Sequence, residues 1–271
     1  MALTDFDEYV DKLKENRVAD FQLSTSIART LRLNASWQSF NPAPAVPTTS
    51  VALNKDSAQS IGPIPDISTG RLTFLGGRFN TSSFGAGGML LVDLLNVSGG
   101  LNATLHATPQ TTNLPTAALT RYTSGEGVMA GIVIYTIIGS TATTVTISYT
   151  NSAGVSGRTS TATSFGGSGF REVGVLIPIP LQAGDTGIRS IESVTLAGST
   201  AGTAANFGVC LFKPLAMISL ESATGAMPLD SVSTGCIIGS LAEIDPDACL
   251  AISAFSAIST SLTGAVILTE V

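Results

Sequence analysis

The sequence is poor in charge. Aspartate, glutamate, lysine and arginine make up 12% of the 271 residues, about half the share usual in soluble domains. Lysine occurs only at Lys12, Lys14, Lys55 and Lys213. Two conditions produce such a composition. The protein acts outside the cell at low concentration, where solubility is weakly selected, or much of its surface is covered by neighbouring subunits in an assembly. Abundant serine and threonine beside scarce lysine favour the second. We therefore expect a homo-oligomer, a trimer, with self-contacts above about 1,000 Å².

Basic residues and histidine are also scarce. The formal net charge is −6 and the pI is about 4.7, so electrostatic attraction to a phosphate backbone is not expected. The single histidine, His106, excludes any site that needs two histidines. The nucleophile-elbow sequence G-x-S-x-G is also missing. The sequence thus predicts neither a direct nucleic-acid partner nor a histidine-based hydrolase.

Motifs for metals and cofactors are weak. Cys210, Cys236 and Cys249 match no zinc spacing and are predicted to be buried, reduced thiols. Residues 243–247 (EIDPD) hold three carboxylates but lack the EF-hand spacing, so we predict an acidic turn. Residues 125–130 (GEGVMA) match G-x-G-x-x-A but lead into a β-branched run, where a dinucleotide site needs a helix. We expect no catalytic activity, no cofactor and no metal.

Membrane and export signals are not evident. The first residues are acidic where a secretory signal would be basic, and no apolar segment follows them. The most membrane-like stretch, residues 248–268, is interrupted by serine, threonine and glycine. We predict neither a cleaved export signal nor a spanning helix.

The clearest structural signals are β-strands. Residues 143–150 (TTVTISYT) alternate apolar and hydroxyl side chains, which indicates a half-buried strand. Residues 131–138 form a β-branched apolar run, and residues 151–154 (NSAG) predict a hairpin turn to a strand at 158–164. Further strands are expected at residues 71–75, 89–95, 128–138, 170–178, 188–196 and 207–211. Many short strands with glycine-rich turns predict an antiparallel β-sandwich or jelly-roll-like domain over residues 48–218.

The N-terminal region differs from the rest. Phe6, Tyr9, Val10 and Leu13 fall at helical spacing and predict an amphipathic helix over residues 5–16. A helical or extended piece follows at 20–33, and three prolines in residues 42–47 predict an extended linker. The apolar stripe could dock on the protein's own body or on a neighbouring subunit. We predict that residues 1–47 form an attachment arm outside the sheet core. Residues 219–271 are expected to be a C-terminal extension of loops, with a short strand near Cys236 and an apolar, serine-rich tail.

Three segments resemble a group of tailed-bacteriophage virion structural proteins. They are residues 113–127 (NLPTAALTRYTSGEG), 139–154 (GSTATTVTISYTNSAG) and 169–174 (GFREVG), within a resemblance that spans roughly residues 71–215. The resemblance implies a capsid-associated protein of the head, of the decoration or cement type, with the major capsid protein as its partner. It also implies a protein made in the host cytoplasm and located in the virion. It carries no catalytic or ligand motif, so it assigns no site residues.

Two other roles stay open. A major capsid or tail-tube subunit would also be a structural protein with a β-rich fold. A receptor- or carbohydrate-binding β-module belongs to a different class, because β-sandwiches host many functions. Sugar-binding modules tend to expose aromatic side chains, and aromatic residues are only 6% of this chain.

Overall fold

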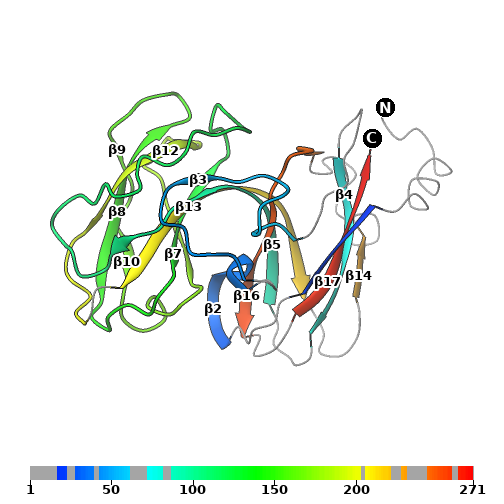
Figure 1. Ribbon diagram of the computed structural model, residues 1–271, viewed down its shortest axis with the longest axis horizontal. Helices are drawn as coiled ribbons and strands as arrows, with labels where there is room; N and C mark the ends of the chain where they lie inside the picture. The colour runs from blue at the N-terminus through cyan, green and yellow to red at the C-terminus, as the bar shows by residue number, and fades with distance from the viewer. Residues whose placement is uncertain are drawn as a thin grey trace.

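The regular secondary structure of the described residues is almost entirely antiparallel β-strand (Figure 1). The computed structural model describes residues 17–22, 28–39, 43–61, 72–81, 87–202, 205–220, 227–230, 243–257 and 262–270. The elements are β1 (Arg17–Gln22), β2 (Ala28–Ala35), the 3-10 turn η1 (Ser36–Ser39), β3 (Val51–Ala52), β4 (Leu72–Thr81), β5 (Gly87–Val97), β6 (Leu101–Asn102), β7 (Met129–Ile134), β8 (Thr143–Asn151), β9 (Arg158–Thr159), β10 (Thr163–Phe165), β11 (Leu176–Ile179), β12 (Ile188–Leu196), β13 (Asn206–Leu220), β14 (Met227–Asp230), β15 (Glu243–Ile244), β16 (Leu250–Ala257) and β17 (Leu262–Glu270). The prediction of a mainly β, antiparallel fold is confirmed.

One sheet curls into a nearly closed barrel. Its strand order is β11-β7-β13-β5-β16-β2, with β3 added to β5 and β6 added to β13. The two ends meet where Asn34 of β2 bridges Val175, which precedes β11. The Ala35 amide also donates to the Gly174 carbonyl at 2.8 Å. Closure leaves few unpaired strand edges on this part of the molecule.

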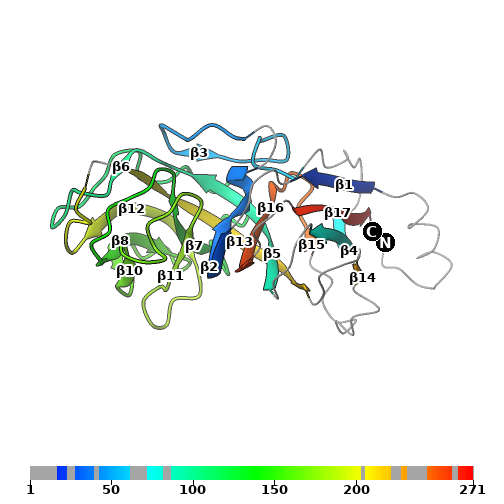
Figure 2. The same cartoon turned by 90° about the horizontal axis from the view of Figure 1, so that it is seen from below.

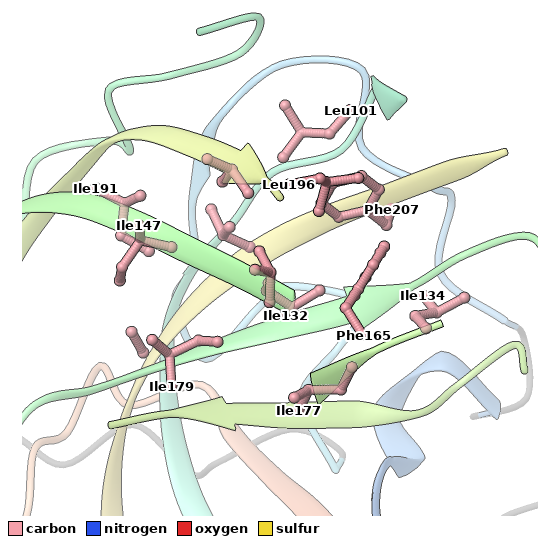
Figure 3. Packing of buried hydrophobic residues seen from close by; sticks show 14 of the residues in the cluster. Leu101, Ile132, Ile134, Ile147, Phe165, Ile177, Ile179, Ile191, Leu196 and Phe207 are labelled. Atoms are coloured by element: carbon pink, nitrogen blue, oxygen red, sulfur yellow. The ribbon is translucent and has the colours of Figure 1, made fainter. Parts of the chain in front are cut away.

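A four-stranded sheet packs on one side of the barrel. Its order is β10-β8-β12, with β9 paired to β8, and Figure 2 shows it beside β7 and β11 at the end of the molecule away from β4 and β17. Between the two layers lies the interlayer core, which Figure 3 shows from close by. The Phe165 ring of β10 meets the Phe207 ring of β13 there, with centroids 4.9 Å apart.

Strand β7 explains why the sequence carries an unbroken apolar run. Ala130, Ile132 and Ile134 face the interlayer core, whereas Val133 and the following Tyr135 face the barrel interior. A strand buried on both faces needs apolar side chains at every position. We call the cluster to which Val133 and Tyr135 belong the barrel core; it also contains Trp37 of η1 and extends to Leu72 of β4 and Ile244 of β15.

Strand β8 confirms the predicted alternation. Val145, Ile147 and Tyr149 are buried, and the residues between them are partly exposed. The returning strand differs from the prediction, because residues 158–164 form the separate strands β9 and β10. At the break, the Ile147 amide donates to the Ser160 hydroxyl at 3.0 Å. The side chain of Ser160 thus takes the place of a backbone partner.

The prediction that residues 1–47 stay outside the sheet core is wrong for the described part of that segment. Strand β2 pairs with β16 in the barrel, and β1 pairs with β17 in a five-stranded sheet of order β1-β17-β4-β14, with β15 on β4. Trp37 is fully buried. The sequence held a signal for β2, because Leu31, Leu33 and Ala35 alternate with polar residues. The predicted helix over residues 5–16 lies outside the described residues.

The prediction of a loop-rich C-terminal extension over residues 219–271 also needs correction. Strand β16 lies between β5 and β2 in the barrel, with Ala251, Ile252 and Ala254 fully buried or nearly so. Strand β17 pairs with β4 along most of its length. Small residues and serine within β16 gave it the composition of a loop. The predicted boundaries at residues 47 and 218 stay predictions.

Candidate functional site

The residues predicted to form an assembly site are not within the described structure. Phe6, Tyr9, Val10 and Leu13 all precede residue 17, where the description begins. Their role as an attachment arm therefore stays a prediction. The described residues instead offer two polar networks and one open groove.

The groove lies beside the short strand β9. It has a volume of about 570 Å³ and opens to solvent, and it is lined by Val155, Ser156, Gly157, Arg158, Thr159, Ser160, Thr161, Gln182 and Ala183. One wall is the chain that leaves the β8 hairpin turn, and the other is the segment that follows β11. The Thr161 amide donates to the Pro180 carbonyl at 3.0 Å and fixes the two walls relative to each other.

An ion pair holds the charged residue of this groove. The Arg158 guanidinium contacts the Asp185 carboxylate through two hydrogen bonds, Nε to Oδ2 at 3.0 Å and Nη2 to Oδ1 at 3.2 Å. The Arg158 side chain is 28% exposed and that of Asp185 only 5%. Because the two contacts form a bidentate pair, they fix the orientation of the guanidinium as well as its position.

Two further side chains hold the Asp185 carboxylate. The Tyr149 hydroxyl donates to Oδ2, and Asn151 Nδ2 donates to Oδ1 at 2.8 Å. These bonds, first that of Tyr149 and then those of Arg158 and Asn151, lower the pKa of Asp185 to about 2. Asp185 is therefore a charged acceptor with both oxygens occupied.

Tyr149 connects this network to the sheet. Its side chain is fully buried on the inner face of β8, and its hydroxyl accepts a hydrogen bond from the Gln182 amide at 2.8 Å. Burial, followed by the bond to Asp185, raises the pKa of Tyr149, so the phenol keeps its proton. The wall at residues 182–185 is thus attached to β8 by side-chain bonds.

The second network crosses the barrel region. Asp93 of β5 is fully buried and pairs with Arg121, Nε to Oδ2 at 2.9 Å and Nη2 to Oδ1 at 2.7 Å. Arg121 also donates to the Leu53 carbonyl at 2.9 Å, and the Cys249 amide donates to Asp93 at 3.0 Å. Burial raises the pKa of Asp93, and the bonds to Arg121 oppose that rise. The hydrogen bonds of Asp93 and Arg121 thus join four separate parts of the chain, around residues 53, 93, 121 and 249.

The predicted acidic turn lies next to this pair. Glu243 belongs to β15, and the Asp245 side chain accepts from the Asp247 amide at 2.9 Å, as in a turn. The Asp247 carboxylate lies 3.7 Å from Arg121 Nη1. Within the described residues, no three histidine, cysteine or acidic side chains are grouped as metal ligands.

The other candidates have local roles. His106 is exposed, and its Nδ1 lies 3.2 Å from the Thr104 carbonyl. Cys210 and Cys249 are buried, as predicted, and burial raises the pKa of each thiol; Cys236 lies outside the described residues. Residues 125–130 turn into strand β7, which confirms that no helix follows this glycine motif. Among the described helices, none has the length and apolar character to cross a bilayer.

Sequence reasoning did not single out Asp93, Arg121 or Asp185. Asp93 carried a usable signal, because it interrupts the apolar run Met89–Leu95 and a buried carboxylate needs a partner. Asp185 lies between glycine and threonine in a turn, where an exposed aspartate is ordinary. Nothing in the local sequence links it to Arg158.

Comparison of the chain with models of protein families, with curated proteins and with solved structures found no match.

Proposed function

We propose that the protein is a non-enzymatic structural subunit of a tailed-bacteriophage particle, a decoration or cement protein of the head. It acts as a homo-oligomer, a trimer, built on a β-sandwich or jelly-roll-like scaffold, and its other partner is the major capsid protein. The observation that carries the proposal is the outer face of β8, which bears hydroxyl groups and no charge.

Four side chains make up this face: Thr144, Thr146, Ser148 and Thr150, all partly or fully exposed. Burying a hydroxyl costs about 1–3 kcal/mol even when it finds no hydrogen-bond partner, whereas burying an ion costs several kcal/mol. A face of short hydroxyl side chains can therefore be covered by a neighbouring subunit at a small desolvation penalty.

The neighbouring strand β12 extends the same surface. Ser193 pairs with Ser148, and Thr195 pairs with Thr146. The acidic side chain beside them, Glu192, accepts hydrogen bonds from Thr150 at 2.7 Å and from Ser190 at 2.9 Å. Oε1 of this carboxylate is thus hydrogen-bonded within the sheet, whereas Oε2 is buried and has no hydrogen-bond partner among the described residues.

The segments that carry the phage resemblance adjoin this sheet. Residues 139–154 include β8 itself. Residues 113–127 contact β12, where the Thr116 amide donates to the Ile191 carbonyl at 3.0 Å, and residues 169–174 reach the β7–β8 connection through the Ile138 amide and the Arg171 carbonyl at 2.9 Å. The sequence resemblance and the hydroxyl-covered face therefore fall on the same part of the molecule.

Two measurements test the proposal. Light scattering of the purified chain at micromolar concentration should give three times its 27.6 kDa mass. Mass spectrometry and immunogold labelling of particles released from cells that carry the gene should find the chain on the head. A monomer in solution together with its absence from purified particles would contradict the proposal.

The outer face provides the matched variant for the solution measurement. Thr146→Lys places an uncompensated charge in the middle of the proposed contact, and we expect it to shift the protein towards the monomer. Thr104→Lys changes the same residue type on a loop outside this sheet and serves as the control. Equal association of both variants would remove the β8 face from the contact.

A further inference from the structure

We propose that the groove beside β9 is a binding site for a neutral, hydroxyl-rich ligand, a short oligosaccharide. The inference does not depend on the proposed role in a particle. It rests on the shape of the groove, on the fixed orientation of Arg158 and on the chemistry of the two walls.

Arg158 has hydrogen-bonding capacity that its structural role leaves unused. Its Nε and Nη2 donate to Asp185, whereas Nη1 makes no hydrogen bond to another described residue. Because Arg158 lines the groove and its guanidinium plane is held by a nearly buried carboxylate, the remaining donors are oriented before a ligand arrives. A donor fixed in advance loses little conformational entropy on binding.

The charge of the site selects against anions. The positive charge of Arg158 is balanced by Asp185, which is itself saturated by Tyr149 and Asn151. A phosphate or carboxylate would find donors here but no net positive charge. A sugar hydroxyl or ring oxygen needs only the donor.

The walls add the groups that a sugar requires. Four exposed polar side chains line the groove around Arg158: the hydroxyls of Ser156, Thr159 and Thr161 and the side-chain amide of Gln182. Each can both donate and accept hydrogen bonds, as the vicinal hydroxyls of a sugar do. Val155 is 51% exposed and offers an apolar surface to the C–H face of a sugar ring. The volume of about 570 Å³ lies in the range typical of small-ligand sites.

A peptide strand fits the groove less well. Adding a strand requires a free row of backbone groups along the edge. The Thr161 amide at this edge already donates to the Pro180 carbonyl, so it is not available to an added strand.

The experiment uses the full chain and defined trisaccharides. Maltotriose, mannotriose and N,N′,N″-triacetylchitotriose are the neutral probes, and trigalacturonic acid is the acidic comparator. Saturation-transfer NMR detects contact, and titration of amide shifts gives the dissociation constant. We expect saturable binding of at least one neutral probe, at least threefold tighter than that of the acidic one, with the shifts centred on residues 155–161 and 182–183.

Three variants locate the site. Gln182→Ala changes an exposed side chain that leaves the fold intact, and we expect at least threefold weaker binding. Arg158→Lys keeps the charge but loses the planar donor pair, and should weaken binding at least tenfold. Thr144→Ala, on the outer face of β8, is the control and should bind as the wild type does.

Several outcomes would overturn the inference. They are the failure of every neutral probe to saturate, equal or tighter binding of the acidic probe, and binding that Gln182→Ala leaves unchanged. If Arg158→Lys fails to fold, Gln182→Ala and the position of the shifted amides decide alone. None of these results bears on incorporation into a particle, so the two proposals fail separately.

Discussion

The interlayer core and the barrel core are built by different means. Between the two sheets the cluster is an interdigitated set of aliphatic and aromatic side chains from β7, β8, β12 and β13. The barrel core is equally apolar but lies beside a buried ion pair, Asp93–Arg121, which joins segments far apart in the chain. The stability of the interlayer core therefore depends on the shape and volume of its side chains. The stability of the barrel core also depends on Asp93 keeping its partner Arg121.

Because of this difference, we expect substitutions in the two cores to affect stability in different ways. An apolar core loses stability in proportion to the atoms removed. A buried pair is nearly neutral when intact and strongly destabilising when one partner is removed, because the remaining charge has no solvent. Four predictions follow from this contrast, in order of decreasing effect.

The largest effect is expected from removing the N-terminal strands. Deleting residues 1–47 takes away β2, which closes the barrel against β16 and Val175, together with the buried Trp37. We expect the barrel to lose its cooperative unfolding transition in urea, with reduced strand signal in circular dichroism.

A shorter deletion separates folding from attachment. Removing residues 1–16 leaves every described strand in place, so the fold should survive while the predicted arm of Phe6, Tyr9, Val10 and Leu13 is lost. Native mass spectrometry should then show a weaker oligomer. A folded protein after deletion of 1–47 would show that β2 is dispensable, and an unchanged oligomer after deletion of 1–16 would remove the arm from the assembly.

The second prediction breaks the buried pair. Arg121→Met should lower the free energy of unfolding by about 3–5 kcal/mol, because Asp93 is left buried without its guanidinium. The double variant Asp93→Leu/Arg121→Met removes both charges and should recover a large part of the loss. Urea unfolding of the wild type, the single variant and the double variant measures both the loss of stability and its recovery. A double variant that is less stable than Arg121→Met would show that the pair is not the source of the effect.

The third prediction addresses the apolar core. Ile147→Ala removes three methyl or methylene groups from β8 at a position that is 1% exposed, and should cost about 2–5 kcal/mol, depending on how far the cavity collapses. Its neighbour Ser148 faces outward on the same strand, so Ser148→Ala should stay within about 0.5 kcal/mol of the wild type. Similar losses in both variants would contradict the assigned faces of β8.

The apolar core could be predicted from the sequence, whereas the ion pairs could not. The alternation of Val145, Ile147 and Tyr149 identified β8 and its faces, because a half-buried strand has a two-residue period. The pairing of Asp93 with Arg121 joins residues separated by 28 positions, and local patterns carry no information about such contacts. The same limit applies to Arg158 and Asp185, and hence to the groove as a candidate site.

The N- and C-terminal strands were missed for a related reason. Strand β16 contains Ser253, which is fully buried, between small apolar residues. Inside a barrel, small side chains are tolerated because opposite strands fill the space, yet the same composition is typical of loops. Residues 43–50, which include Pro44 and Pro47, form no strand, in agreement with the break in regular structure that these prolines predict.

The smallest effect is expected from pH, at the ion pair that lies near solvent. The pKa of Asp185 is lowered to about 2 in the folded protein, whereas an unfolded aspartate titrates near 3.9. The folded state therefore favours the ionised carboxylate, and its contribution to stability is complete above about pH 4. It should decline as the pH falls from there through about 2, because protonation removes the acceptor for Tyr149, Asn151 and Arg158.

The comparison with Asp185→Asn isolates this group from the other carboxylates. We expect the urea midpoint of the wild type to fall more steeply between pH 5 and pH 2 than that of the variant, with the two curves converging at the acid end. Gln182 should lose protection from amide exchange over the same range, because its amide donates to the Tyr149 hydroxyl. Parallel curves would mean that Asp185 has the same pKa in both states, and that its hydrogen bonds to Tyr149 and Arg158 do not favour the charged form.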